Sequence, residues 1–237
     1  FRSEINEIEI LIQISFFLFI PIIKIQSQII KLKVNNTGTV KILNKEKITN
    51  TIMVDGVAAS ITGNVITVDN KEGEITLSWT GTISNCSLMF AGMINITEID
   101  LSGFDSEAVT DMRYMFLNCI SLKSIKLDNF ITTNVEYMEA MFANCISLTS
   151  LVISSFNTGN AIKLTRMFYN CHSLISLNLP DMTTTKVVNF NYMFFNCYSL
   201  KTLDLKRWSI SQIRLIGCFA MFYNCTSLTS LNISNFD

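Results

Sequence analysis

The chain has 237 residues, of which 49% are hydrophobic and 16% are charged, and its formal net charge is −1. This is enough apolar material for a sizeable core in one or two domains. The near-neutral charge argues against a nucleic-acid partner, because binding to phosphates needs a basic face. Two prolines and nine glycines exclude a disordered, collagen-like or linker-rich protein.

An apolar run spans positions 10 to 23 near the start of the chain. Its length is typical of a signal-peptide core and too short for an ordinary membrane span. Polar residues follow from Gln26 to Gln28, which suits cleavage there, so residues 1–28 are predicted to be a signal peptide. Glutamates upstream are unusual for such a segment, and two alternatives stay open: an uncleaved membrane anchor, and a buried strand or misassigned exon.

Residues 29–84 contain no repeat and are predicted to form a small β module. Short runs of strand-forming residues alternate with turn signals such as Asp55-Gly56. The first coil of a solenoid needs its open apolar end covered, so the module is interpreted as an N-terminal cap. The predicted strands are Ile29–Val34, Thr39–Leu43, Thr51–Val54, Ala59–Thr62, Asn64–Val68 and Glu74–Trp79.

A repeat of 26 residues occupies the rest of the chain. The pair Met-Phe recurs at spacings of 26, with one of 28 at the end: Met89-Phe90, Met115-Phe116, Met141-Phe142, Met167-Phe168, Met193-Phe194 and Met221-Phe222. Such a period is typical of a solenoid, because one unit cannot bury its own apolar face. The chain begins with Phe1 rather than Met and stops at Asp237 within a repeat, so we expect it to be part of a longer protein.

Each repeat is predicted to contain a helix and a short strand. In the second copy the apolar residues fall three or four positions apart, as on one side of a helix of about three turns: Val109, Met112, Met115, Phe116 and Cys119. Residues 122–127 then alternate like a strand with one apolar side. The predicted fold class is therefore an α/β repeat solenoid, a leucine-rich-repeat stack of helix-plus-short-strand coils with a parallel β-sheet. It covers residues 85–237 in about six repeats, the last truncated.

Five of the seven cysteines form one structural column, because Asn-Cys follows Met-Phe in five copies: Cys119, Cys145, Cys171, Cys197 and Cys225. Met93 takes the cysteine position in the first copy, so cysteine exchanges there with a residue that can form neither a disulfide nor a zinc site. The column is therefore interpreted as core packing. One or two disulfides stay open as an alternative, since neighbouring strands are close enough for bridging.

No catalytic or cofactor motif is recognised. The chain has no Gly-rich phosphate loop and no Gly-x-Ser-x-Gly elbow, and its one histidine, His172, replaces residues such as Ile120 and Tyr198 at a turn. A structural histidine is favoured over a catalytic one. The protein is predicted not to be an enzyme, to bind no metal and to need no cofactor, small-molecule cofactors included.

The candidate binding face consists of the strand side chains that point away from the core, which in a solenoid form the natural contact surface. One column is small and polar throughout, and the column beside it varies. The alternative is a purely structural reason, namely that small side chains suit a flat or tightly curved sheet. By alternation the face comprises Glu98, Asp100, Ser124, Lys126, Ser150, Val152, Ser176, Asn178, Thr202, Asp204, Ser230 and Asn232.

The motif Met-Phe-x-x-Cys-x-Ser-Leu-x-x-Leu-x-Leu, clearest in residues 141–153, resembles the BspA-like leucine-rich repeats, a 26-residue surface-protein repeat of bacteria, mycoplasmas and protists. The resemblance covers about residues 86–237. It implies a leucine-rich-repeat solenoid, surface display or secretion, and adhesion or binding to host and matrix, without catalysis. The first cysteine, Cys86, lies far beyond any signal cleavage site, so the lipoprotein anchor of many mycoplasma members is missing.

The sequence thus predicts a cell-surface or secreted repeat protein that binds an unknown protein or glycan through its exposed strand face. Membrane association is expected only through an uncleaved N-terminal segment. One alternative is an intracellular solenoid scaffold for protein–protein interaction. Another is that the repeats are a targeting arm of an enzyme whose catalytic domain lies outside this sequence.

Overall fold

The computed structural model describes residues 27–34, 38–41, 52–54, 57–59, 65–68, 74–181, 186–208 and 215–235. The apolar run of the predicted signal peptide lies outside these ranges, and the predicted cleavage region meets the first residues of strand β1 (Ser27–Val34). Within the described ranges, no helix has the length and hydropathy needed to cross a bilayer.

In the described N-terminal residues the strands are β1, β2 (Gly38–Lys41), β3 (Ile52–Val54), β4 (Val57–Ala59), β5 (Val65–Val68) and β6 (Glu74–Thr80). Each overlaps one of the predicted segments, although β4 shares only Ala59 with the predicted strand Ala59–Thr62. β1 pairs antiparallel with β6, β6 pairs with β3, and β2 pairs with β5. Strand β1 alternates as a half-buried strand should, with Ile30 and Leu32 fully buried and Lys31 exposed.

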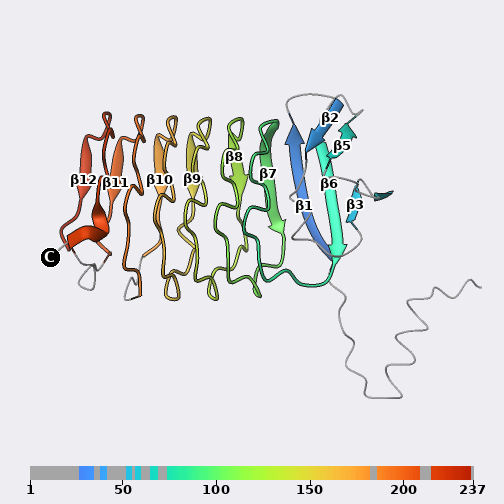
Figure 1. Cartoon of the computed structure of the whole chain (residues 1–237), viewed down its shortest axis with the longest axis horizontal. Coiled ribbons are helices and arrows are strands. Elements are labelled where there is room, and N and C mark those ends of the chain that lie inside the picture. The colour runs from blue at the N-terminus through green and yellow to red at the C-terminus, as the bar shows by residue number, and fades with distance from the viewer. Residues whose placement is uncertain are drawn as a thin grey trace, which may run out of the picture.

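The repeats stack side by side along the long axis of the molecule, with one short strand per coil in a common layer (Figure 1). These strands are β7 (Ile96–Gly103), β8 (Ser124–Lys126), β9 (Ser150–Val152), β10 (Ser176–Asn178), β11 (Thr202–Asp204) and β12 (Ser230–Asn232). The pairs β7–β8, β9–β10 and β11–β12 are parallel and in register. The stack is therefore compatible with the predicted repeat solenoid, although each coil after the first contributes only three strand residues where six were predicted.

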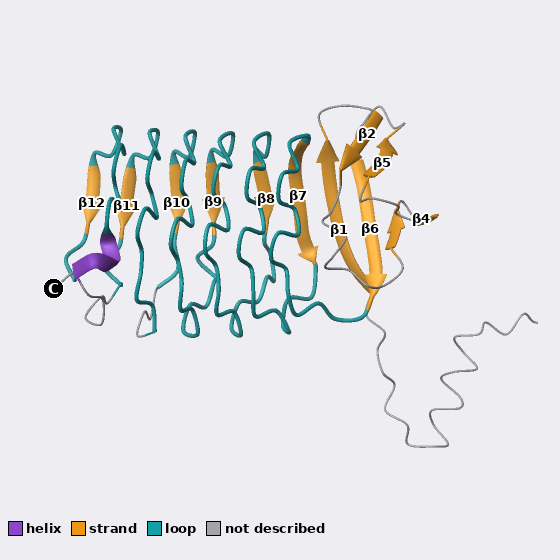
Figure 2. Cartoon of the chain, in the orientation of Figure 1, coloured by secondary structure: helices purple, strands orange, loops and turns teal. Residues whose placement is uncertain are grey.

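The predicted helix over residues 109–119 is wrong. In the described part of the chain no α-helix is present, and the regular helical element is the single 3-10 turn η2 (Leu215–Cys218) (Figure 2). The backbone of each copy instead forms consecutive turns. The amide of Met115 donates to the carbonyl of Met112 at 3.3 Å, and that of Cys119 to Phe116 at 3.2 Å. Since each turn advances three residues, the inward positions recur with nearly the spacing of a helical face.

The remaining amides of this segment bind the next coil. The amide of Phe116 donates to the carbonyl of Met141 at 2.9 Å, and that of Asn118 to Ala143 at 2.9 Å. A helix would have used these groups internally, between residues four apart. The alternation of local turns and hydrogen bonds between coils therefore makes a second layer, which we call the turn layer: residues 86–93, 112–119, 138–145, 164–171, 190–197 and 218–225.

Two positions of every turn segment have a left-handed backbone. Asn118 has φ of 61°, and the equivalent asparagines of the later copies have values of 58° to 61°. Asparagine and glycine adopt this conformation most readily, which explains why Gly92, with φ of 73°, replaces asparagine in the first copy. The amides of these asparagines also form a ladder, in which the Nδ2 of Asn144 donates to the Oδ1 of Asn118 at 2.6 Å.

The core lies between the strand layer and the turn layer. One phenylalanine per coil stacks on the next, with ring centroids 5.2 to 5.8 Å apart from Phe90 to Phe222. A second column, from Phe104 to Phe156, stacks at 5.9 and 6.0 Å. Offset aromatic stacking adds to the burial of apolar area, so these columns tie each coil to its neighbours.

The β module meets the first coil through β1, which pairs antiparallel with β7. Gln28, only 2% exposed, spans this junction: its Nε2 donates to the carbonyl of Gly81 at 3.1 Å, and its Oε1 accepts from the amide of Asp105 at 2.8 Å. The module thus lies beside the first coil, and its role as a cap stays a prediction. The boundaries of the three predicted parts stay a prediction.

Candidate functional site

The twelve residues of the predicted binding face lie on the outward side of strands β7 to β12. Nine are exposed, and Glu98, Asp100 and Asn232 are partly exposed. The registers place Ser150 beside Ser176 and Val152 beside Asn178, so the constant and varied columns of the sequence are true columns of the sheet. The structure therefore brings these residues together, and their role in binding stays a prediction.

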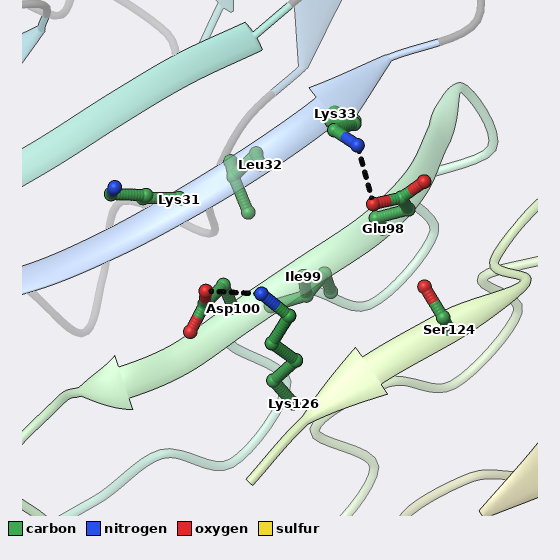
Figure 3. A pocket seen from close by; sticks show the side chains of 8 residues that line it. All are labelled: Lys31, Leu32, Lys33, Glu98, Ile99, Asp100, Ser124 and Lys126. Carbon is green, nitrogen blue, oxygen red and sulfur yellow. Dashed lines mark hydrogen bonds and ion pairs between the residues drawn. The ribbon is translucent and has the colours of Figure 1, made fainter. Parts of the chain in front are cut away.

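A cavity of about 240 Å³ lies at the N-terminal end of this face, where β7 lies between β1 and β8. Its lining forms two rows across the strands, as Figure 3 shows: Lys31, Asp100 and Lys126 in one, and Lys33, Glu98 and Ser124 in the other. The β1 lysines were missed from sequence, because antiparallel docking of β1 beside the repeat strands leaves no signal in the repeat itself.

Ion pairs hold the charges of the cavity in place. The Nζ of Lys33 lies 2.8 Å from Glu98, and that of Lys126 lies 3.2 Å from Asp100. Burial raises the pKa of Asp100, but hydrogen bonds from Ser102 and Lys126 outweigh it, so the pKa of Asp100 lies below its usual value. The carboxylate of Asp100 is therefore charged near neutral pH, which suits polar recognition rather than proton transfer.

His172 is part of a ring contact. Its half-buried imidazole lies tilted against Tyr198, with ring centroids 4.9 Å apart. Among the residues that the structure describes, no group of three His, Cys, Asp or Glu side chains could hold a metal ion.

The seven cysteines form no disulfide with one another. In the column, each thiol donates to the carbonyl oxygen of the core phenylalanine in the preceding coil, as Cys119 does to Phe90 at 3.1 Å and Cys171 to Phe142 at 3.1 Å. Burial raises the pKa of the thiols of Cys119 and Cys171 to about 12. Since the thiolate is the nucleophile and the metal ligand, these cysteines are suited to packing rather than to chemistry.

A cluster of aromatic side chains covers the outer side of the turn layer in the later coils. Tyr169, Phe195 and Tyr223 stack with centroids 5.0 and 4.9 Å apart. Tyr192 packs edge-on against Phe195 and against Phe219, at 5.7 and 5.3 Å. We call these five residues the aromatic cluster. Its sequence signal was an aromatic residue directly after Met-Phe in three successive copies. The cluster was not recognised from this signal, because the segment was wrongly predicted to be a helix.

The stacked parallel strand pairs define a repeat protein whose fold is compatible with a solenoid. Its sequence matches the model of a family described as "Mycoplasma protein of unknown function, DUF285" over residues 84–198 and 150–237. The chain belongs to this family. No curated protein and no solved structure matches it.

Proposed function

We propose that this chain is a non-enzymatic surface or secreted protein of the BspA-like leucine-rich-repeat type, which mediates adhesion by binding a protein or glycan. The DUF285 match is related to BspA-like repeats and supports the type. The contact surface is the outward strand face from Glu98 to Asn232.

The observation that carries the proposal is the shape and polarity of that face. Its small column of Ser124, Ser150 and Ser176 is exposed, and the column beside it presents side chains as different as Lys126 and Val152. Val152 is 66% exposed, although a valine gains from burial. Repeat proteins use such extended surfaces of stacked elements for binding.

Binding through this face is tested with the full chain on arrays of glycans and matrix proteins. The double variant Val152→Glu and Asn178→Glu places two like charges side by side, and it is expected to abolish binding to any ligand that the original chain retains. The matched control is Thr133→Glu, an exposed position outside the face. Equal binding by the double variant and the control would refute this face as the contact surface.

Display is tested separately, by protease treatment of intact cells that express the tagged full-length protein. Surface exposure is the expected result, together with a mature N-terminus at Ser27 or Gln28, which keeps the buried Gln28 junction in the mature protein. Protection from the protease, with residues 10–23 retained, would refute surface display.

A second candidate is an intracellular scaffold with the same fold. The cysteine column supports it, because its five thiols form no disulfide, whereas secreted proteins usually oxidise their cysteines. The same cell experiment separates the two candidates, since a scaffold would stay protected and would bind partners from lysate through the strand face.

A further inference from the structure

The loops that connect the turn layer to the strands form a row along one long edge of the stack, at the top in Figure 1. Neighbouring loops contact one another: the Oγ of Ser147 donates to the carbonyl of Ile120 at 2.6 Å, and the rings of His172 and Tyr198 have centroids 4.9 Å apart. The row is therefore continuous from coil to coil. We call it the loop edge, and it consists of residues 92–97, 118–123, 144–149, 170–175 and 196–201.

Large side chains, most of them apolar, occupy one equivalent position in each loop of this edge. Ile120 and Tyr198 are 39% and 38% exposed, and Ile175, elsewhere on the edge, is 44% exposed. These three residues belong to coils that have another described coil on each side, so their exposure does not follow from where the sequence ends. Soluble proteins seldom leave a contiguous row of this kind without a partner. The residues at the equivalent position are Ile94, Ile120, Ile146, His172 and Tyr198.

The loop edge contains no aspartate or glutamate. Its charged residues are Lys123 and Lys201, which are both exposed and form no ion pair with any residue that the structure describes. The acidic residue closest to the edge in sequence is Glu98, directly after the first loop, and its carboxylate lies 2.8 Å from the Nζ of Lys33. The edge therefore combines exposed apolar groups with two lysines whose charge is not neutralised within the described protein.

The opposite edge of the stack has a different character in the first three coils. Its loops there, residues 104–108, 128–134 and 154–160, contain three acidic residues and no lysine or arginine. An anionic surface would repel these loops and attract the loop edge. The acidic residues are Asp105, Glu107 and Asp128.

We infer that the loop edge docks on a lipid surface with anionic headgroups. The isoleucines would enter the boundary between headgroups and acyl chains, the tyrosine would lie at the headgroup level, and the two lysines would meet lipid phosphates. A row of protruding loops suits a plane better than a small ligand, which needs a concave pocket. The absence of carboxylates from the edge fits the same partner, because an anionic membrane would repel them.

The test measures co-sedimentation of the full chain with vesicles of phosphatidylcholine that contain phosphatidylserine. Binding is expected, and it should weaken at high salt and on pure phosphatidylcholine. The double variant Lys123→Gln and Lys201→Gln should weaken binding by about tenfold or more. The double variant Ile94→Ser and Ile120→Ser should have an effect of similar size, about tenfold. The control Ile131→Ser removes a 42% exposed isoleucine from the opposite edge and should bind as the original chain does.

Tryptophan fluorescence locates the contact, which matters because the apolar residues 10–23 are present in every variant. On vesicles, the emission of Ile120→Trp should move to shorter wavelength relative to the original chain with its two tryptophans, and that of Ile131→Trp should not. The strand-face double variant Val152→Glu and Asn178→Glu should bind vesicles normally, so this edge and the proposed adhesive face can fail independently.

Three results would overturn the inference. They are absence of vesicle binding, full binding by the folded lysine and isoleucine double variants, and an equal emission shift for Ile131→Trp. An edge that binds a protein instead of lipid would give one of the first two results.

Discussion

The thiol of Cys145 donates a hydrogen bond to the backbone carbonyl oxygen of Phe116, 3.2 Å away in the preceding coil. The same oxygen accepts the amide of Cys119 and so closes a turn. Cysteine at this position therefore fills space and also joins two coils through one carbonyl group. Free cysteine is a small hydrophobe with a weak donor, which suits both roles.

Cys145→Ala is expected to lower the free energy of unfolding by about 1–2 kcal/mol, because it removes a fully buried sulfur and a donor. Cys145→Val restores most of the volume and should cost less. Both values are measured by urea denaturation. Cys218→Ala, at a partly exposed position, is the control and should change stability least. Loss of folding in the original chain on reduction would instead establish a structural disulfide.

The buried thiols predict a loss of stability at high pH. Burial raises the pKa of Cys119 and Cys171 to about 12 and that of Cys225 to about 11, against a reference of about 8.5 in the unfolded chain. Above that reference the unfolded chain loses protons that the folded state keeps. The free energy of unfolding is therefore at its full value below pH of about 8.5 and falls as the pH rises toward 12.

The measurement is urea denaturation at a series of alkaline pH values. Other groups titrate in this range, so the informative comparison is with the double variant Cys119→Ala and Cys171→Ala, whose stability should fall less steeply. An identical pH dependence in the two proteins would contradict the assignment to the thiols.

The inward positions of each coil were predictable, because burial follows the apolar pattern in whatever conformation the backbone adopts. Met112, Met115 and Phe116 are all fully buried, as predicted. The turn conformation was not predictable from the same pattern, because three-residue turns and a helix place apolar residues at similar spacings. The discriminating signal was the exchange of Asn118 for Gly92, which indicates a left-handed backbone that a helix cannot contain.

The candidate site was also predictable only in part. Strand alternation placed Ser150 and Val152 outward, and they are exposed. Lys31 and Lys33 join the face only because β1 pairs with β7, a contact between segments far apart in the chain. The aromatic cluster depends on which side of the turn layer Tyr169 and Phe195 occupy, and the repeat spacing alone does not define that side.

The left-handed position of Asn144, with φ of 61°, predicts a difference between two substitutions. Asn144→Ala should lower stability by about 1 kcal/mol more than Asn144→Gly, because alanine is strained in this region and glycine is not. Both variants lose the side-chain ladder to Asn118 and Asn170, so that loss cancels in the comparison. Chemical denaturation measures the difference, and equal stabilities would contradict the assigned backbone conformation.

Phe142→Ala should be among the most damaging truncations. Its ring stacks between those of Phe116 and Phe168, with centroids 5.2 and 5.7 Å away, and it is fully buried. The expected loss is about 3–5 kcal/mol. Phe222 ends the same column and is only partly buried, so Phe222→Ala should cost less. Thermal unfolding monitored by circular dichroism ranks the two, and the reverse order would contradict the continuous column.

Gln28 predicts how firmly the β module is attached to the first coil. Gln28→Leu keeps most of the volume but removes the hydrogen bonds to the carbonyl of Gly81 and from the amide of Asp105, at an expected cost of about 1 kcal/mol for each bond. Hydrogen exchange should then rise in β1 and β7, which share this junction, while the distant pair β11–β12 keeps its protection. Lys31→Leu, an exposed change on the same strand, is the control and should leave exchange unaltered. A uniform rise in exchange along the whole stack would mean that the module and the coils unfold as one unit, so that Gln28 stabilises the entire solenoid rather than the junction alone.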